Sequence, residues 1–203
     1  MTRYILGIVF SVILFTAQSA GAGNVALEEA TVEMVMGNVD APVAMIEYSS
    51  LSCPHCAAFH RETLPKIKET YIDTGKVKLI YRDFPLESLA MAGAMISRCA
   101  GKAKYFGLIE MMFRSQEKWT RAENPKEELE RIARFGGMSK ADVGECLDNA
   151  ALLDSIKARA LNGQKEFKVE STPTFVIDGE VVPGALPFEK FQKIIDKALA
   201  GKK

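Results

Sequence analysis

Apolar residues in the first part of the chain form short runs that are typical of buried strands. Residues 43–48 (Val-Ala-Met-Ile-Glu-Tyr) are mostly apolar and follow Pro42, and residues 76–81 alternate apolar and polar positions in their first half. Runs of this length are typical of strands in a sheet that is covered on both faces. We therefore expect two parallel strands, joined by a right-handed crossover.

A helix is predicted between these strands, because residues suited to one buried face recur at helical spacing after Pro54. Pro65 lies inside this helix and should kink it, since proline lacks the N–H that an interior position donates. The face expected to pack inward consists of Phe59, Thr63, Ile67 and Tyr71.

The period of the apolar residues becomes helical from about residue 86 to residue 170. One stripe continues past Gly101, a second helix ends at Gly136-Gly137, and Ser139 begins a third with the pattern of a capping box. Residues 174–177 and 180–182 then flank Asp178-Gly179 and predict a hairpin. Residues 187–199 predict a last helix.

The order of these elements predicts the fold class. The chain is predicted to run strand, helix, strand, then about 85 helical residues, then a hairpin and a helix. This is the order of a thioredoxin fold with an all-helical insertion. We expect an α/β protein in which residues 23–85 and 171–203 form the two halves of the thioredoxin fold. Residues 86–170 form the insertion.

The first 22 residues are typical of a secretory signal peptide. Arg3 precedes the apolar residues 4–15, and Ala20-Gly21-Ala22 supplies small residues for cleavage. The apolar run is shorter than the roughly 20 residues of a spanning helix, which is the argument against an uncleaved anchor. We expect cleavage after Ala22 and a soluble mature protein in the periplasm, an oxidising compartment.

Charge narrows the partners only a little. The 26 basic and 26 acidic residues balance, so no basic surface for nucleic acid is predicted.

The chemistry is expected at Cys53-Pro54-His55-Cys56, where the first strand leads into the helix. Pro54 suits the first helical turn, and the helix dipole favours a thiolate at Cys53. His55 adds positive charge or a hydrogen bond. A stabilised thiolate makes the oxidised pair a strong electron acceptor. Half of a metal site and a fixed structural disulfide are the alternatives. Structural zinc needs about four ligands, and only His55 and His60 lie near, so we expect no metal and no cofactor.

The Cys-Pro-His-Cys motif, the strand with Glu47, the helical insertion and Ser171-Thr172-Pro173-Thr174-Phe175 together resemble the DsbA family of bacterial thiol:disulfide oxidoreductases. The resemblance implies that Cys53 is the exposed nucleophile and Cys56 the buried resolving thiol. It also implies that Pro173 is a cis-proline facing the disulfide, with Thr172 pairing with an extended substrate chain. A plain trans proline is the alternative at Pro173.

The resemblance further implies that the protein donates its disulfide to newly exported, cysteine-containing proteins. A quinone-linked membrane partner of the DsbB type would reoxidise it, and we expect a monomer. A disulfide isomerase or reductase on the same scaffold is the alternative. A short helical oligomerisation segment at residues 25–36 stays open.

Four further residues carry predictions. Glu47 in an apolar strand is either a proton carrier for Cys56 or a member of an ion pair at the end of the strand. His60 is expected to be a solvated helix residue. Cys99 and Cys146 both lie on apolar helix faces of an exported chain, so we expect a structural disulfide between them. Two separate buried thiols are the alternative.

Overall fold

A computed structural model describes residues 24–202 of the chain. The predicted signal peptide, residues 1–22, lies outside the described residues. No helix within the described part is both long and apolar enough to cross a membrane.

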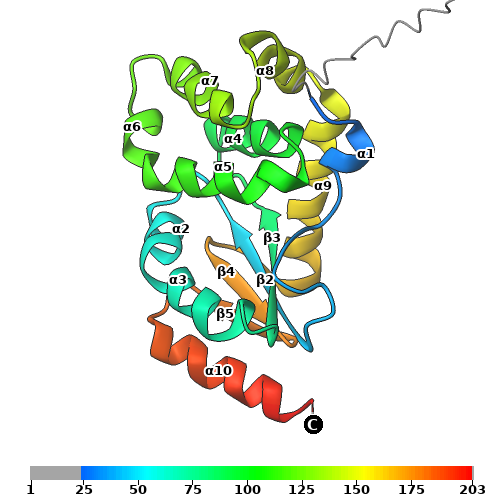
Figure 1. Ribbon diagram of the computed structural model, residues 1–203, viewed down its shortest axis with the longest axis vertical. Coiled ribbons are helices and arrows are strands. Elements are labelled where there is room, and N and C mark those ends of the chain that lie inside the picture. The colour runs from blue at the N-terminus through cyan, green and yellow to red at the C-terminus, as the bar shows by residue number, and fades with distance from the viewer. Residues whose placement is uncertain (1–23, 203) are drawn as a thin grey trace, which may run out of the picture.

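A five-stranded mixed sheet forms the centre of the fold (Figure 1), and its strand order is β1-β3-β2-β4-β5. β2 lies in the middle, parallel to β3 on one side and antiparallel to β4 on the other. The bounds are β1 Met34–Met36, β2 Val43–Ser49, β3 Val77–Asp83, β4 Thr174–Ile177 and β5 Glu180–Pro183. The two parallel strands and the hairpin are therefore confirmed.

Helices cover both faces of this sheet. Val43, Met45 and Phe175 pack against the helical run that follows β2 and against α10 (Phe188–Ala200). Tyr48 and Val176 point to the opposite face, where α9 (Ala150–Phe167) lies along the sheet. Since successive residues of a strand point to opposite faces, Glu47 shares the first face with Val43 and Met45.

The helical run after β2 contains two wide turns. It consists of α2 Pro54–Ala58, a π-helical turn Phe59–Thr63, α3 Leu64–Ile67 and a second π-helical turn Lys68–Ile72. In the first wide turn the Leu64 N–H donates to the Phe59 carbonyl five residues back. Pro65 has no N–H to donate, so irregular turns beside it are expected. The predicted inward face is buried: Phe59, Thr63, Ile67 and Tyr71.

Most of the remaining helices gather at one end of the sheet (Figure 1). They are α4 Ser88–Cys99, α5 Lys102–Arg114, α6 Gln116–Thr120, α7 Pro125–Phe135 and α8 Lys140–Leu147. Gly101, with φ at +85°, separates α4 from α5, and Ser139 forms the predicted capping box with Asp142. The fold class is confirmed: an α/β thioredoxin fold that carries additional helices.

Two elements near the N-terminus were not predicted. Leu27–Ala30 is a single helical turn, α1, and Met34–Met36 is the edge strand β1, paired with β3. Residues 25–36 therefore do not form the helical oligomerisation segment that the sequence left open, because part of this segment belongs to the sheet. A strand of three residues is too short to show a period.

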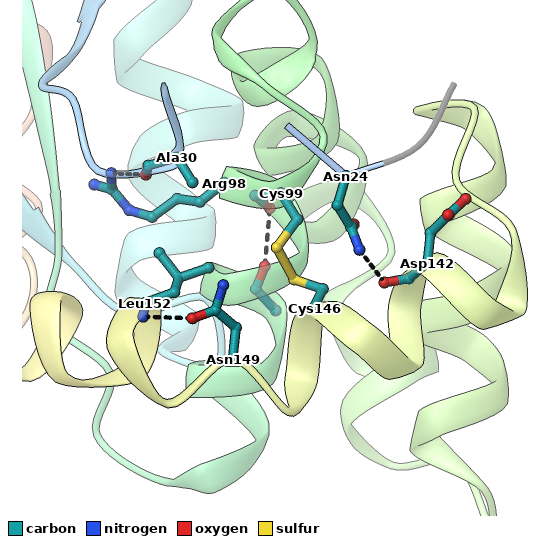
Figure 2. Close-up of a disulfide and its surroundings, with 10 residues drawn as sticks. Asn24, Ala30, Arg98, Cys99, Asp142, Cys146, Asn149 and Leu152 are labelled. Atoms are coloured by element: carbon teal, nitrogen blue, oxygen red, sulfur yellow. Dashed lines mark hydrogen bonds between the residues drawn. A yellow bond between two sulfur atoms is a disulfide. The ribbon is translucent and has the colours of Figure 1, made fainter. Parts of the chain in front are cut away.

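A disulfide joins α4 to α8 inside the helical end (Figure 2). The Cys99 and Cys146 sulfurs are 2.06 Å apart and the two Cα atoms 6.1 Å apart. The described N-terminal residues cross beside it, since the Val25 N–H donates to the Cys99 carbonyl at 3.0 Å and the Asn24 amide to the Asp142 carbonyl at 2.8 Å. The predicted pair is thus bonded in the structure, in place of two separate thiols.

Candidate active site

The Cys53-Pro54-His55-Cys56 segment lies where the central strand leads into α2. The Cys53 N–H donates to the Ser50 carbonyl at 3.1 Å in a turn, and the Cys53 carbonyl accepts from the Ala57 N–H as the helix begins. Cys53 is the N-cap residue and Pro54 occupies the first turn, where its missing N–H costs no hydrogen bond. The backbone therefore places Cys53 at the positive end of the helical run.

The two thiols differ in their surroundings. Both are free, and Cys53 is 7% exposed whereas Cys56 is fully buried. Cys53 is therefore less open than the exposed nucleophile that we expected, because the Thr172 loop covers it: its thiol donates to the Thr172 carbonyl at 3.3 Å. Pro54 and His55 are exposed.

The same surroundings separate the acidities of the thiols. The pKa of Cys53 is lowered to about 5, mainly by a hydrogen bond from the Cys56 thiol, and also by the Thr172 side chain and the backbone N–H groups of Cys56 and His55. Desolvation opposes this shift but is outweighed. Burial raises the pKa of Cys56, and the charges of Cys53 and Glu47 raise it further. Cys53 is therefore a thiolate at neutral pH while Cys56 keeps its proton.

The loop opposite the thiols contains the predicted cis-proline. The Thr172–Pro173 peptide bond is cis, so the trans alternative does not hold. The Pro173 carbonyl accepts from the Gly184 N–H at 2.8 Å, and Thr174 then starts β4 beside β2. The sheet thus holds the loop against Cys53.

Glu47 and His60 form a buried pair beneath the dithiol. Both Glu47 oxygens lie near His60 Nε2, at 3.0 and 3.1 Å. The Glu47 side chain is fully buried and that of His60 is only 6% exposed. The prediction of a solvated His60 is therefore wrong. His60 lies one turn after Cys56, so both point to the sheet side of the helix, and this spacing could have indicated it.

Gln116 is a site residue that sequence reasoning missed. It belongs to the short helix α6, and its side-chain amide donates to the carbonyls of Leu51 at 2.7 Å and Cys53 at 3.0 Å. These bonds hold the backbone at the start of the motif, at Cys53 and two residues before it. Neither α6 nor this contact has a signal in the sequence, since Gln116 is far from Cys53 along the chain.

Within residues 24–202, no group of three or more His, Cys, Asp and Glu side chains is placed to hold an ion. What the arrangement offers is a dithiol in which one sulfur is a stabilised nucleophile and leaving group.

Comparisons with known proteins agree with this site. A family model described as thioredoxin matches residues 29–197. A putative protein-disulfide oxidoreductase from Rickettsia conorii is 31% identical over 172 residues, which are 84% of this chain and 62% of the relative. A probable disulfide bond formation protein D from Bacillus anthracis is 30% identical, over 81% of this chain and 77% of the relative. The chain spans less than two thirds of the length of the Rickettsia relatives.

Two solved structures are similar to this chain in both fold and sequence. The crystal structure of Wolbachia pipientis alpha-DsbA1 matches with a TM-score of 0.78 and 31% identity, covering 84% of this chain and 92% of that one. A protein-disulfide isomerase structure from Novosphingobium aromaticivorans matches with a TM-score of 0.71 and 25% identity, covering 82% and 97%. With its thioredoxin fold, its dithiol at the start of a helix and these relatives, the chain belongs to the DsbA family of disulfide oxidoreductases.

Proposed function

We propose that this protein is a thiol:disulfide oxidoreductase that donates a Cys53–Cys56 disulfide to cysteine-containing substrate proteins. The observation that carries the proposal is the split between a Cys53 with a pKa of about 5 and a buried, protonated Cys56. Stabilising the Cys53 thiolate stabilises the reduced form, and this makes the oxidised form a stronger oxidant.

The reaction has two exchange steps. A substrate thiolate attacks Cys53 Sγ, the Cys53–Cys56 bond breaks, and Cys56 leaves as a thiolate that takes up a proton. A second substrate thiolate then attacks the substrate sulfur of the mixed disulfide and releases Cys53 as a thiolate. Two electrons pass from the substrate thiols to the dithiol. The low pKa of Cys53 favours its release, since less basic thiolates leave faster.

Thr172 and Pro173 are proposed to hold the substrate. The Thr172 carbonyl lies 3.3 Å from Cys53 Sγ in the loop that precedes β4. An extended substrate segment beside this loop would bring its own sulfur next to Cys53. Backbone pairing of this kind gives affinity without demanding one sequence, which suits an enzyme that oxidises many partners.

The cellular setting is part of the proposal. The signal-peptide pattern of residues 1–22 supports export to the periplasm, where a quinone-linked membrane protein of the DsbB type would regenerate the disulfide. We propose a monomer. An isomerase or reductase on the same scaffold is the second candidate, favoured by the likeness to the protein-disulfide isomerase from Novosphingobium aromaticivorans. A stable dimer or trimer in a solution mass measurement would favour it.

The test uses a two-cysteine peptide. The oxidised wild type should oxidise the reduced peptide, and Cys53→Ser should abolish the transfer. Cys56→Ser, incubated with the oxidised peptide, should accumulate a mixed disulfide at Cys53 that is visible by mass spectrometry without reductant.

Two results would contradict the proposal. One is faster alkylation of Cys56 than of Cys53 near neutral pH. The other is a reduction potential near that of thioredoxin, about −270 mV, which would indicate a reductase.

A further inference from the structure

We infer that His60 relays a proton between an apolar groove and the buried Cys56 thiol, through the Glu47 carboxylate. This inference rests on the proposed function, because it concerns a step of that reaction. Cys56 must take up a proton when it leaves the disulfide and lose it when the disulfide forms again. Its side chain is fully buried, so this proton needs a path through the protein.

Glu47 is the acidic group next to Cys56, but it has no contact with water of its own. Its side chain is fully buried, and its charge acts on the Cys56 thiol. Ser49 lies two residues further along β2 and on the same face. Its hydroxyl is buried without a hydrogen-bond partner among the described residues, yet close enough to Cys56 to lower that thiol's pKa. Ser49 is therefore placed to connect Glu47 to Cys56.

His60 connects Glu47 to the outside of this buried site. In the tautomer with its proton on Nε2, His60 donates to the two Glu47 oxygens, since an ionised carboxylate only accepts hydrogen bonds. Nδ1 is then the ring nitrogen that remains free to exchange a proton. The ring is held by Phe113, whose centroid is 4.2 Å away, and it lines a groove of about 490 Å³. Imidazole is the side chain best suited to such exchange near neutral pH.

We assign the relay to His60 because the other titratable and charged groups around it stay protonated, pair with opposite charges or line a different pocket. Burial keeps the pKa of Tyr81, from β3, well above its usual value, so Tyr81 stays protonated. From α5, Glu110 and Arg114 line the groove but pair with each other at 2.5 Å. The remaining charged groups lie on the helical run of His60 itself: Arg61, which lines the adjoining pocket, and Lys68, which pairs with Asp73.

The relay balances when the disulfide is donated. The Cys53–Cys56 bond breaks, and Cys56 leaves as a thiolate. His60 Nδ1 takes one proton from water in the groove, Nε2 passes its own proton to the Glu47 carboxylate, and Glu47 passes one proton to Cys56, so that neutral His60 is left with its proton on Nδ1. When the disulfide forms again, the Cys56 thiol gives its proton to Glu47, Glu47 passes a proton to His60 Nε2, and Nδ1 releases one to water in the groove. The Cys56 thiolate then attacks Cys53 Sγ, and the group bound there leaves as a thiolate.

The experiment isolates the proton step of Cys56. Glutathione is attached to Cys53 as a mixed disulfide, and its release by Cys56 is followed by stopped flow between pH 5 and pH 9. His60→Gln keeps a side-chain donor for Glu47 but cannot titrate, so release near pH 7 should slow by about 10- to 100-fold, the scale of general acid–base catalysis. In His60→Ala, added imidazole should restore much of the lost rate.

Two comparisons separate this role from a structural one. Arg61→Gln, a change of charge on the neighbouring residue, should leave the release rate within about twofold, and the rate of Cys53 alkylation should stay the same in all variants. An unchanged rate and pH profile in His60→Gln would overturn the inference. So would a slow His60→Ala that imidazole does not restore. Release from the mixed disulfide needs no protein substrate, so failure of the relay and failure of the proposed oxidase activity are distinguishable.

Discussion

At the scale of single residues, two identical thiols acquire opposite properties from their positions. Cys53 lies at the helix start, where the Cys56 thiol and two backbone N–H groups stabilise its thiolate. Cys56 lies inside, next to Glu47, where burial and negative charge oppose ionisation. Disulfide donation needs two thiols of different acidity. This difference therefore comes from the environment of the motif as much as from its amino-acid sequence.

The first prediction concerns the side chain of His55. His55→Ser keeps the backbone N–H that stabilises the Cys53 thiolate but removes the exposed imidazole. We expect a higher Cys53 pKa and a lower reduction potential, by about 30 mV for each 1.4 kcal/mol lost. Equilibration with glutathione buffers measures the potential, and thiolate absorbance measures the pKa. An unchanged potential would mean that the Cys56 thiol, Thr172 and the backbone tune Cys53 alone.

At the scale of elements, the disulfide between α4 and α8 is a link that stabilises the helical end. The bonded cysteines are 47 positions apart in sequence. By the chain-entropy model, a loop of this length is worth about 4 kcal/mol at most. Cys99→Ala/Cys146→Ala should lower the free energy of unfolding by up to that amount in urea titrations. Cys53 alkylation should not change in this variant, and an equal unfolding free energy would contradict the prediction.

The contact between α9 and β2 depends on a glycine. A Cβ at Gly163 would lie 2.4 Å from a ring carbon of Tyr48, and that ring is itself held by Phe84, Phe167 and Arg82. Gly163→Ala should therefore lower the free energy of unfolding by about 1–3 kcal/mol, the cost of overpacking a core.

A glycine in α8 gives the matched control for this change. A Cβ at Gly144 would meet no atom within 4 Å. Gly144→Ala should raise stability by about 0.4–1 kcal/mol, because alanine restricts the unfolded chain. Thermal unfolding of both variants measures the difference, and equal melting temperatures would show that the Tyr48 ring moves aside at no cost.

At the scale of the whole molecule, the thiols couple the redox state to stability. In the reduced protein the Cys53 pKa is about 5, whereas an unfolded thiol titrates near about 8.5. Between these values the unfolded state holds one more proton, so stability rises with pH. The Cys53 contribution is complete above about pH 8.5 and is lost as the pH falls through 5. The raised pKa of Cys56 reverses the slope above about pH 8.5.

The oxidised protein lacks both of these titrations. The reduced form should therefore lose stability relative to the oxidised form as the pH falls from about 8.5 to about 5. Denaturant titrations of the two forms at several pH values measure this difference. A difference that stays constant with pH would contradict the low pKa of Cys53.

Prediction from the sequence succeeded where the pattern is local. β2, β3, the hairpin, α10 and the capped start of α8 follow from apolar period, turn residues and the Ser139 box. It failed where an element is only about one turn long, or where a contact with a distant part of the chain determines a residue's surroundings. α6 and β1 are too short to show a period. His60 was assigned to solvent because its neighbours, Glu47 from β2 and Phe113 from α5, come from other elements.

The sequence by itself determined the thioredoxin scaffold and the place of the dithiol, because strand period, helix spacing and the position of Pro54 act over a few neighbouring residues. Only the tertiary structure decided the surroundings of the two sulfurs. Thr172 comes to Cys53 from 119 positions away, and Gln116 from 63. Hydrogen bonding and burial depend on distance in space, and packing sets that distance for residues far apart in the chain.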